Sequence, residues 1–428
     1  MKKRSFCLFL ILALFLLCGC VFPLQRVSPD PTPAPTPEPT PTPTPSPTPS
    51  PSSGFDPSDF AIPAPGFELE EDDAAAQPAE SASLSPLAEP KLAVFWYAMA
   101  DAQVFALREQ FGPALEGSGL PYREFDAEND RSRQQDQVRD AVNDGWNILA
   151  VQLVQEDSLE EAEEIVRLAA GCPVLFFDRI PEPALFPDSQ TRFAGNVGMI
   201  CSDPSELGRV QGEMIGEFLV GRFGVTDLNQ DGQISYTCLL GDRNDPAALT
   251  LRSAALDTAD AVLAREGYRP LVFMDSENAD GFQADPEGLW SSDAGTELIR
   301  SDIQYYNYAN GNMLELIVAN NDDMALGALT ALQSAMCNLG DGSSATIPLF
   351  GIGGSAAARS AVSLGQMAGT VDRNAAGYAR AVIGSARGLA EGRSAAEVFA
   401  SLADTSSDCS VADADPSSLH IAPLPVSS

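Results

Sequence analysis

Residues Leu314–Ala328 read LELIVANNDDMALGA, a strand-like run that changes abruptly into a helical pattern. The first half, LELIVAN, is short and apolar on both faces, which is typical of a strand buried within a parallel sheet. From Met324 onward, MALGALTALQSAMCNLG has its apolar residues at helical spacing. A strand that passes directly into a helix is the repeating unit of an α/β fold.

The same unit recurs along the chain from Lys91. Amphipathic stretches separate short apolar runs, so we expect parallel strands joined by helices. About ten such strands are too many for one compact sheet, which favours two doubly wound lobes. The other expected strands are at 91–97, 147–154, 173–178, 233–241, 269–275, 346–354 and 367–372. We place residues 91–204 plus 372–400 in the first lobe and 205–371 plus 401–428 in the second.

In a doubly wound sheet the ligand site lies beyond the carboxyl ends of the strands. Here those ends fall at Asp101, Asp178, Asn320–Asp322, Gly353 and Asp372. Two lobes with facing strand ends form a cleft that can close on a small molecule. The sequence therefore predicts a small-molecule site near these positions.

The first 20 residues have the pattern of a secretory signal peptide. Residues 2–4 are basic, and the apolar run Phe6–Leu17 is too short to span a bilayer comfortably. Leu17–Cys20 (LCGC) resembles a lipobox, in which the last cysteine becomes the lipidated N-terminus of a bacterial lipoprotein. We expect Cys20 to anchor the mature protein in the bacterial cell membrane, on its extracytoplasmic side. Ordinary cleavage with an incidental Cys20 is the alternative.

Residues 21–90 are expected to form a disordered tether. Pro31–Ser53 alternates proline with threonine or serine, a pattern that favours polyproline II over helix or strand. At about 3.1 Å per residue this stretch would reach roughly 70 Å. The acidic, alanine- and proline-rich segment that follows has no periodicity. Such a tether suits an anchored protein that must clear a cell wall.

The formal net charge is −35, from 25 Lys and Arg against 60 Asp and Glu. This balance argues against binding to nucleic acid or to an anionic membrane surface. A solvated acidic surface is the commoner meaning of such acidity, and affinity for cations is the other.

Cysteine and histidine usage argues against an enzyme. Of the 8 cysteines, those beyond the signal region are scattered, with no metal-ligand spacing and no pattern of a disulfide framework. His420 is the single histidine, so catalysis that depends on imidazole is not expected. Nucleophile elbows and phosphate-binding loops are also missing from the sequence.

A second motif, DLNQDGQISYTC at Asp227–Cys238, begins like a calcium-binding loop. Asp227, Asn229 and Asp231 occupy positions 1, 3 and 5, and Gly232 occupies the turn position. Position 12, which holds a bidentate glutamate in such loops, is Cys238. Either the loop is an Asx-rich turn that binds nothing, or the missing carboxylate comes from elsewhere in the chain.

Taken with IVANNDDMALGA and IPLFGIGG…MAGTV, this loop resembles those of the galactose/glucose-binding proteins. These are type I periplasmic binding proteins that serve ABC sugar transporters and sometimes chemoreceptors. The resemblance runs in order from about Lys91 to Val426. It implies two Rossmann-like lobes joined by three crossings, with a sugar bound in the cleft between them.

In that family a distant glutamate completes a Ca²⁺ shell, and the matching residue is Glu315. The other ligands implied by the resemblance are Asp227, Asn229, Asp231, the backbone carbonyl of Gln233, and Ser235. The family usually has glutamine where Ser235 stands. Hard oxygen donors suit Ca²⁺ far better than Zn²⁺, and we expect the ion to be structural.

The resemblance also implies sugar-binding residues. Asp101, Trp290 and Asn321 match the family's aspartate, stacking tryptophan and hydrogen-bonding asparagine. Arg252 matches the pocket arginine if one extra residue is allowed in the spacing. For Trp290 the structural alternative is a place in the hydrophobic core.

Other positions depart from the family. Gln103 replaces the second stacking aromatic, with Phe105 as a substitute two residues on, and Asp178 replaces an asparagine. The histidine and aspartate of the family's GHxD segment are missing; Asn244, Asp245 and Ala247 lie there.

Two departures lie in the last strands. Gly353 replaces an aspartate, and Arg373 replaces an asparagine beside Asp372. Losing several fixed acceptors should abolish tight recognition of glucose or galactose. Arg373 suggests either an acidic sugar or another anionic ligand, or an internal salt bridge to Asp101 and Asp178.

The predicted function is that of a lipid-anchored solute-binding protein that delivers a sugar or sugar-like molecule to an ABC permease. The alternative is a surface protein of the same fold that presents a ligand to a chemoreceptor or sensor kinase. An enzyme is the weakest of the three hypotheses.

Overall fold

The computed structural model describes residues 85–181, 195–310, 313–413 and 415–427. All of them belong to one unit of the chain, Ala74–Ser428. The expected signal peptide, with Cys20, and nearly all of the expected tether lie outside the described residues. Among the described helices, none combines the length and apolar composition that a membrane span requires.

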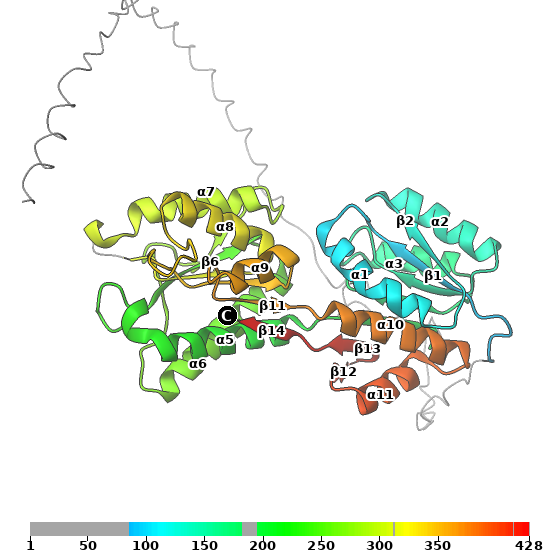
Figure 1. The fold of residues 1–428 in the computed structure, drawn as a ribbon. Helices are drawn as coiled ribbons and strands as arrows, with labels where there is room; N and C mark the ends of the chain where they lie inside the picture. The colour runs from blue at the N-terminus through cyan, green and yellow to red at the C-terminus, as the bar shows by residue number, and fades with distance from the viewer. Residues whose placement is uncertain (1–84, 182–194, 311–312, 414, 428) are drawn as a thin grey trace, which may run out of the picture. The chain divides into compact units, whose positions relative to one another are not determined.

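The first sheet has the strand order β12-β13-β5-β4-β3-β1-β2 (Figure 1). Its neighbours pair in parallel except β12, which runs antiparallel to β13. The bounds are β1 Leu92–Trp96, β2 Tyr122–Asp126, β3 Ile148–Val151, β4 Val174–Phe177, β5 Val197–Cys201, β12 Cys409–Ala412 and β13 Asp415–Ile421. Every residue of β1, β3, β4 and β5 is buried, as expected for strands covered on both faces.

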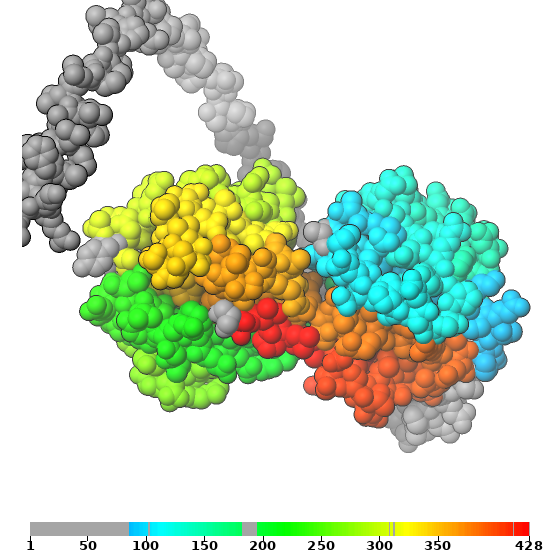
Figure 2. Space-filling model, viewed as in Figure 1, coloured from blue at the N-terminus to red at the C-terminus, as the bar shows by residue number. Residues whose placement is uncertain are grey.

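Among the described residues, five helices accompany this sheet: α1 Ala102–Glu116, α2 Arg131–Asn143, α3 Leu159–Leu168, α10 Ala375–Ala390 and α11 Ala395–Thr405. The core beneath α1 and α10 contains an aromatic cluster in which Trp96 meets Phe111 and Phe177 edge-on at 5.1 and 5.3 Å. In Figures 1 and 2 the orange helix α10 lies against the blue and cyan N-terminal elements, and α11 packs beside α10. The C-terminal part of the chain therefore completes the lobe that its N-terminal part begins.

The second sheet has the order β14-β11-β10-β9-β6-β7, with β8 also paired to β6. Its strands are parallel except β14, which runs antiparallel to β11. The bounds are β6 Ser235–Leu240, β7 Val272–Phe273, β8 Gln283–Ala284, β9 Leu316–Ala319, β10 Leu349–Gly353, β11 Gly369–Asp372 and β14 Leu424–Ser427.

The helices of the second lobe are α5 Pro204–Thr226, α6 Pro246–Arg265, α7 Ser292–Tyr305, α8 Asp322–Ser334 and α9 Ala356–Ser363, with the short 3-10 helix η3 at Tyr308–Asn310. Glycines let two helix pairs approach closely. A Cβ on Gly212 of α5 would lie 2.3 Å from the Ala255 carbonyl oxygen of α6, and one on Gly327 of α8 would lie 2.0 Å from that of Ser292. Larger side chains at these positions would force the helices apart.

The chain passes between the sheets three times: between β5 and α5, between β11 and α10, and between β13 and β14. This agrees with the two-lobe α/β prediction but corrects its last boundary. We assigned 401–428 to the second lobe, whereas α11, β12 and β13 pack with the first sheet and only β14 reaches the second. We assigned no strand to this segment from the sequence, so nothing there indicated which sheet the segment joins.

Six of the described strands escaped the sequence analysis: β2, β5, β8, β12, β13 and β14. Two of them show why. Strand β2 is a largely polar edge strand, YREFD, without an apolar run. Strand β5, VGMIC, is interrupted by Gly198, where a Cβ would come within 2.6 Å of the Phe399 ring. The glycine that weakens the strand pattern is required by the packing of α11.

Candidate functional site

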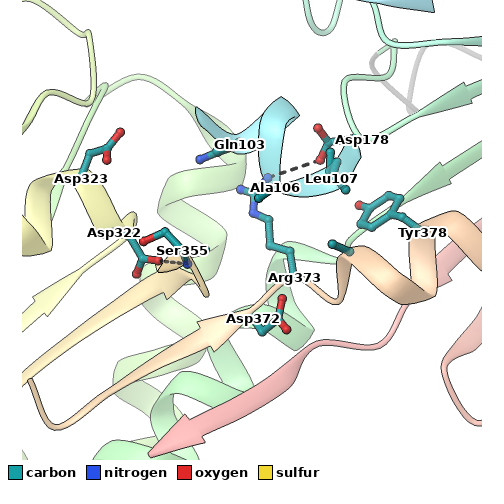
Figure 3. A pocket seen from close by; sticks show the side chains of 12 residues that line it. Gln103, Ala106, Leu107, Asp178, Asp322, Asp323, Ser355, Asp372, Arg373 and Tyr378 are labelled. Carbon is teal, nitrogen blue, oxygen red and sulfur yellow. Dashed lines mark hydrogen bonds and ion pairs between the residues drawn. The ribbon is translucent and has the colours of Figure 1, made fainter. Parts of the chain in front are cut away.

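A pocket lies at the carboxyl ends of strands from both sheets (Figure 3). Its walls are formed by segments that follow β1, β4, β9, β10 and β11, which is where the strand-end rule places a ligand site. The polar lining residues are Gln103, Asp178, Asp322, Asp323, Ser355, Asp372, Arg373 and Tyr378, and the others are Ala106, Leu107, Gly353 and Ala375.

Asp178 is held at the end of β4 in a left-handed conformation, φ 60°. The Gln152 side-chain amide donates to its Oδ2 at 2.9 Å, and Arg373 Nη1 lies 3.7 Å from its Oδ1. Burial raises the pKa of Asp178, while Arg373 and Arg179 oppose that shift. The sequence left open whether Arg373 binds an anionic ligand or forms an internal salt bridge. The structure contains the salt bridge to Asp178, with a long N–O distance.

Asp372 ends β11 and organises the passage into α10. Its Oδ1 accepts a hydrogen bond from the Asn374 backbone N–H at 2.8 Å, and its Oδ2 pairs with Arg359 of α9. Asn374 has a φ of 63°, and its own side chain caps α10 by accepting from the Gly377 N–H at 2.9 Å. These contacts fix the backbone from which Arg373 projects.

Asp322 stands at the N-terminus of α8 and ties together three strand ends. Its carboxylate accepts from the Ser355 N–H at 2.7 Å and from the Thr370 hydroxyl at 2.6 Å. Gly353 leaves room for it, because a Cβ there would lie 2.9 Å from Asp322 Oδ2. Burial raises the pKa of Asp322. At Gly353, where the resemblance implies an aspartate, the nearby carboxylate is instead that of Asp322 from α8.

Asn321 and Trp290, which we predicted to contact sugar, contact each other. The Asn321 amide donates to the Trp290 carbonyl oxygen at 3.0 Å, and its Oδ1 caps α8 by accepting from Met324 N–H at 2.9 Å. The Trp290 ring packs over Gly241, where a Cβ would lie 1.8 Å from it, and against the core of the second sheet. Neither residue lines the pocket.

Asp101 is the N-cap of α1, accepting from the N–H groups of Gln103 and Val104 at 2.8 and 3.1 Å. Burial, followed by a hydrogen bond to Asp101, raises the pKa of the Tyr97 hydroxyl. The guanidinium of Arg179 covers the Tyr97 ring at 4.2 Å from its centre. Asp101 therefore caps the helix whose first turn contributes Gln103 to the lining, and is not itself a lining residue.

Arg252 lies inside the second lobe. It donates from Nη2 to the Gly281 carbonyl oxygen at 2.9 Å and lies over the Phe282 ring at 5.5 Å. Of the six residues that we predicted to bind the ligand, the pocket lining contains Asp178 and Arg373. Asp101, Arg252, Trp290 and Asn321 lie outside that lining. Their binding roles stay predictions.

Sequence reasoning did not single out Asp323, Ser355 or Tyr378. Asp323 and Ser355 lie at or just before helix N-termini that follow strand ends, so extending the strand-end rule by one helical turn would have included them. Tyr378 is fully buried, and its hydroxyl lies 3.0 Å from the Ser202 hydroxyl. Nothing in its sequence neighbourhood distinguishes Tyr378 from a core residue.

The acidic loop lies apart from the pocket, between α5 and β6. Asp227 and Asn229 both accept from the Asp231 N–H, at 3.2 and 3.0 Å, and Asp227 also accepts from the Gly232 N–H at 2.9 Å. Gly232 has a φ of 78°, as its turn position requires. The polar side chains of the loop therefore turn inward around its backbone.

Glu315, which comes from just before β9, lies against this loop. It accepts from Leu228 N–H at 2.7 Å and from Ser235 N–H at 2.9 Å, and so joins the beginning of the loop to its end. The residue is 1% exposed, and burial raises its pKa despite these hydrogen bonds. Across the described residues, no group of three or more His, Cys, Asp or Glu side chains converges as a ready-made metal site.

Comparison with known protein families shows which family the chain belongs to. Residues 92–394 match the model of the periplasmic binding protein domain. The chain belongs to this family. As a periplasmic binding protein it has a curated relative in Haemophilus influenzae, the D-galactose/methyl-galactoside binding periplasmic protein MglB. The two are 28% identical over 325 residues, which cover 74% of this chain and 86% of the relative.

Solved structures of binding proteins share the fold. One is an ABC transporter periplasmic solute binding protein from Actinobacillus succinogenes with bound D-allose, with a TM-score of 0.56 and 16% identity over 79% of this chain and 97% of that one. Another is the Caulobacter myo-inositol binding protein bound to myo-inositol, with a TM-score of 0.51 and 16% identity over 81% and 95%.

These findings confirm the family and the two-lobed fold expected from the sequence. They also support the prediction that the chain is not an enzyme, because its relatives are binding proteins.

Proposed function

We propose that this periplasmic binding protein is the extracytoplasmic solute-binding component of an ABC sugar transporter. It binds a sugar or sugar-like molecule in the pocket at the strand ends and presents it to the permease subunits. The observation that carries the proposal is the pocket itself, where side chains from both sheets provide hydrogen-bonding groups next to apolar surface. The names of the galactose-binding relative and of the solved binding proteins support it.

The pocket differs from a hexose site built on free acceptors. Asp322 already accepts from Ser355 and Thr370, and Asp372 already pairs with Arg359. Groups committed in this way shape the pocket but offer few free lone pairs to sugar hydroxyls. We therefore expect a ligand other than galactose or glucose to bind most tightly.

Isothermal titration calorimetry against a panel of mono- and oligosaccharides and polyols, with calcium present, tests the proposal. We expect at least one member to bind with a dissociation constant in the micromolar range or below. Heat changes absent across the whole panel would overturn the proposal.

We further propose that the acidic loop holds a structural Ca²⁺ ion. The proposed ligands are the side chains of Asp227, Asn229, Asp231, Ser235 and Glu315 and the carbonyl oxygen of Gln233. Six hard oxygen donors match what calcium requires. Glu315 supports the assignment, because it is buried and no described Lys or Arg forms an ion pair with it. The hydrogen bonds from Leu228 and Ser235 offset part of the cost of burying this carboxylate, and a cation would offset the rest.

The anchor is the last part of the proposal. Lipidation at Cys20 would hold the protein at the outer face of the cell membrane, with residues 21–90 as the tether. Mass spectrometry of the mature N-terminus would detect a diacylglyceryl cysteine at position 20. An unmodified N-terminus there would show ordinary secretion instead.

A further inference from the structure

The charges on the pocket walls are unequal. Its described lining contains four carboxylates, Asp178, Asp322, Asp323 and Asp372, and one cationic side chain, Arg373. An excess of this kind within a partly enclosed space acts strongly on a charged ligand, because the low-dielectric walls screen it less than water does. The sign of the excess therefore bears on which ligands the pocket admits.

Two of the four carboxylates are already neutralised. Asp178 faces Arg373 at 3.7 Å, and Asp372 pairs with Arg359, which lies outside the lining. Arg373 is thus committed to an acid of its own pocket. This arrangement removes the reason for expecting an anionic ligand.

The remaining two carboxylates have no cationic partner among the described residues. Asp322 accepts hydrogen bonds from a backbone N–H and a hydroxyl, both of them neutral donors. Asp323, next to it, is exposed and borders the pocket without such donors. In Figure 3 its carboxylate stands apart from the other labelled side chains.

Asp101 adds to this negative region from the first sheet. After burial, the charge of Asp101 is the influence that raises the pKa of Asp323. Asp101 has one oxygen occupied as the cap of α1. A positively charged group near Asp323 would be attracted by both carboxylates, whereas a ligand carboxylate would be repelled by both.

We propose that the pocket selects a polyhydroxylated ring that carries a protonated amine, an amino sugar or amino polyol, with Asp323 as the carboxylate that receives the ammonium group. The inference rests on the proposed function, because it takes the pocket as the site of a sugar-like ligand. Hydroxyls of the ring bind the neutral and paired polar groups of the walls, and the amine supplies the charge that the walls lack. Charge-assisted hydrogen bonds to a free carboxylate are stronger than neutral ones.

The test compares ligands that share a sugar ring and differ in the charge of one substituent. Glucosamine, N-acetylglucosamine, glucose and glucuronate, with the matching galactose series and amino polyols bearing the amine at other ring carbons, are titrated calorimetrically into the full-length protein at neutral pH. We expect at least one free amine to bind tenfold or more tightly than its neutral parent, and the uronates not to bind. The preference should decrease as sodium chloride is raised.

Asp323→Asn is the decisive variant. It should remove the preference for the amine over its neutral parent, because it deletes the charge and keeps the size of the side chain. Asp293→Asn is the matched control, since Asp293 is also an exposed acid in the first turn of a second-lobe helix but lies outside the pocket.

The outcomes separate the two proposals. If neutral sugars bind as tightly as every amine, or if Asp323→Asn keeps the preference, the amine inference is wrong and the sugar-binding function stands. If no member of either panel binds, the sugar-binding function fails and takes the inference with it.

Discussion

The loop at 227–235 and the pocket use their carboxylates in opposite ways. In the loop, Asp227 faces backbone N–H groups a few residues away. Glu315 comes from the distant segment before β9 and accepts from the N–H groups of Leu228 and Ser235, so backbone donors satisfy both carboxylates. In the pocket, Asp323 comes from a helix N-terminus and has no donor of this kind. A satisfied acidic cluster stabilises a lobe, whereas an unsatisfied one at a pocket wall is available to a ligand.

Glu315→Gln gives the largest expected effect and tests the structural side of this comparison. Both carboxylate oxygens of Glu315 accept hydrogen bonds, from the N–H groups of Leu228 and Ser235. In the glutamine variant one oxygen becomes an NH₂ group, which cannot accept, so one of these N–H donors loses its partner. With calcium present we expect a loss of about 4 kcal/mol in the free energy of unfolding, most of it the calcium contribution. Urea denaturation in calcium and in chelator measures both parts.

The control for that variant is Glu297→Gln, which removes an exposed acid paired with Arg300. It should change stability by less than about 0.5 kcal/mol. An unaltered calcium response in Glu315→Gln would remove Glu315 from the proposed site.

Asp302 of α7 lies in neither region and shows the cost of a buried acid without a cation. Burial raises its pKa to about 7, although Gln283 donates to its Oδ2 at 2.7 Å. In the unfolded chain Asp302 loses its proton near pH 4, whereas in the folded protein it keeps the proton up to about pH 7. The free energy of unfolding therefore decreases as the pH rises from about 4 to about 7. Asp302→Asn should therefore stabilise the protein at pH 8, by up to about 3 kcal/mol, and have little effect below pH 4.

Chemical denaturation across this pH range checks that prediction, with Asp293→Asn on the same helix as an exposed control. A stability gain that is the same at pH 4 and pH 8 would show that titration of Asp302 is not its cause.

For a physical reason, the sequence brought together the residues of the loop more completely than those of the pocket, while calcium binding by the loop stays a prediction. The loop and the run Leu314–Ala328 are continuous, so the spacing of their residues survives in three dimensions. The pocket is assembled from short segments after separate strands, each too small to have a pattern of its own. The strand-end rule located Asp178 and Asp372, but not Tyr378, which is packed like a core residue. Likewise the alternation of strands and helices predicted both sheets but did not predict the strand β13, which joins the first sheet.

Trp290→Ala asks whether a residue matched by family resemblance belongs to the pocket or to the core. Its ring packs over Gly241 and the second-lobe core, so truncation should destabilise the protein by about 2 kcal/mol. Because the pocket lining lacks Trp290, we expect ligand affinity to change by less than threefold. Thermal unfolding and calorimetric titration measure the two effects.

Leu289→Ala, at a neighbouring side chain that is 68% exposed, should change neither quantity. An affinity loss of tenfold or more in Trp290→Ala alone would identify a stacking platform instead.

Arg359→Ala gives the smallest expected change in stability and the most direct test of the charge argument. Its ion pair with Asp372 is partly exposed, and its other hydrogen bond, from Nε to the Gly354 carbonyl oxygen, is 2.8 Å long. Loss of such contacts should cost about 1 kcal/mol or less. The variant also frees a third pocket carboxylate, so affinity for a cationic ligand should rise while affinity for its neutral parent stays the same.

Arg380→Ala breaks a comparable pair with Asp408 away from the lining and should leave both affinities unchanged. Weaker binding of the amine in Arg359→Ala would mean that Asp372 matters through its position rather than its charge.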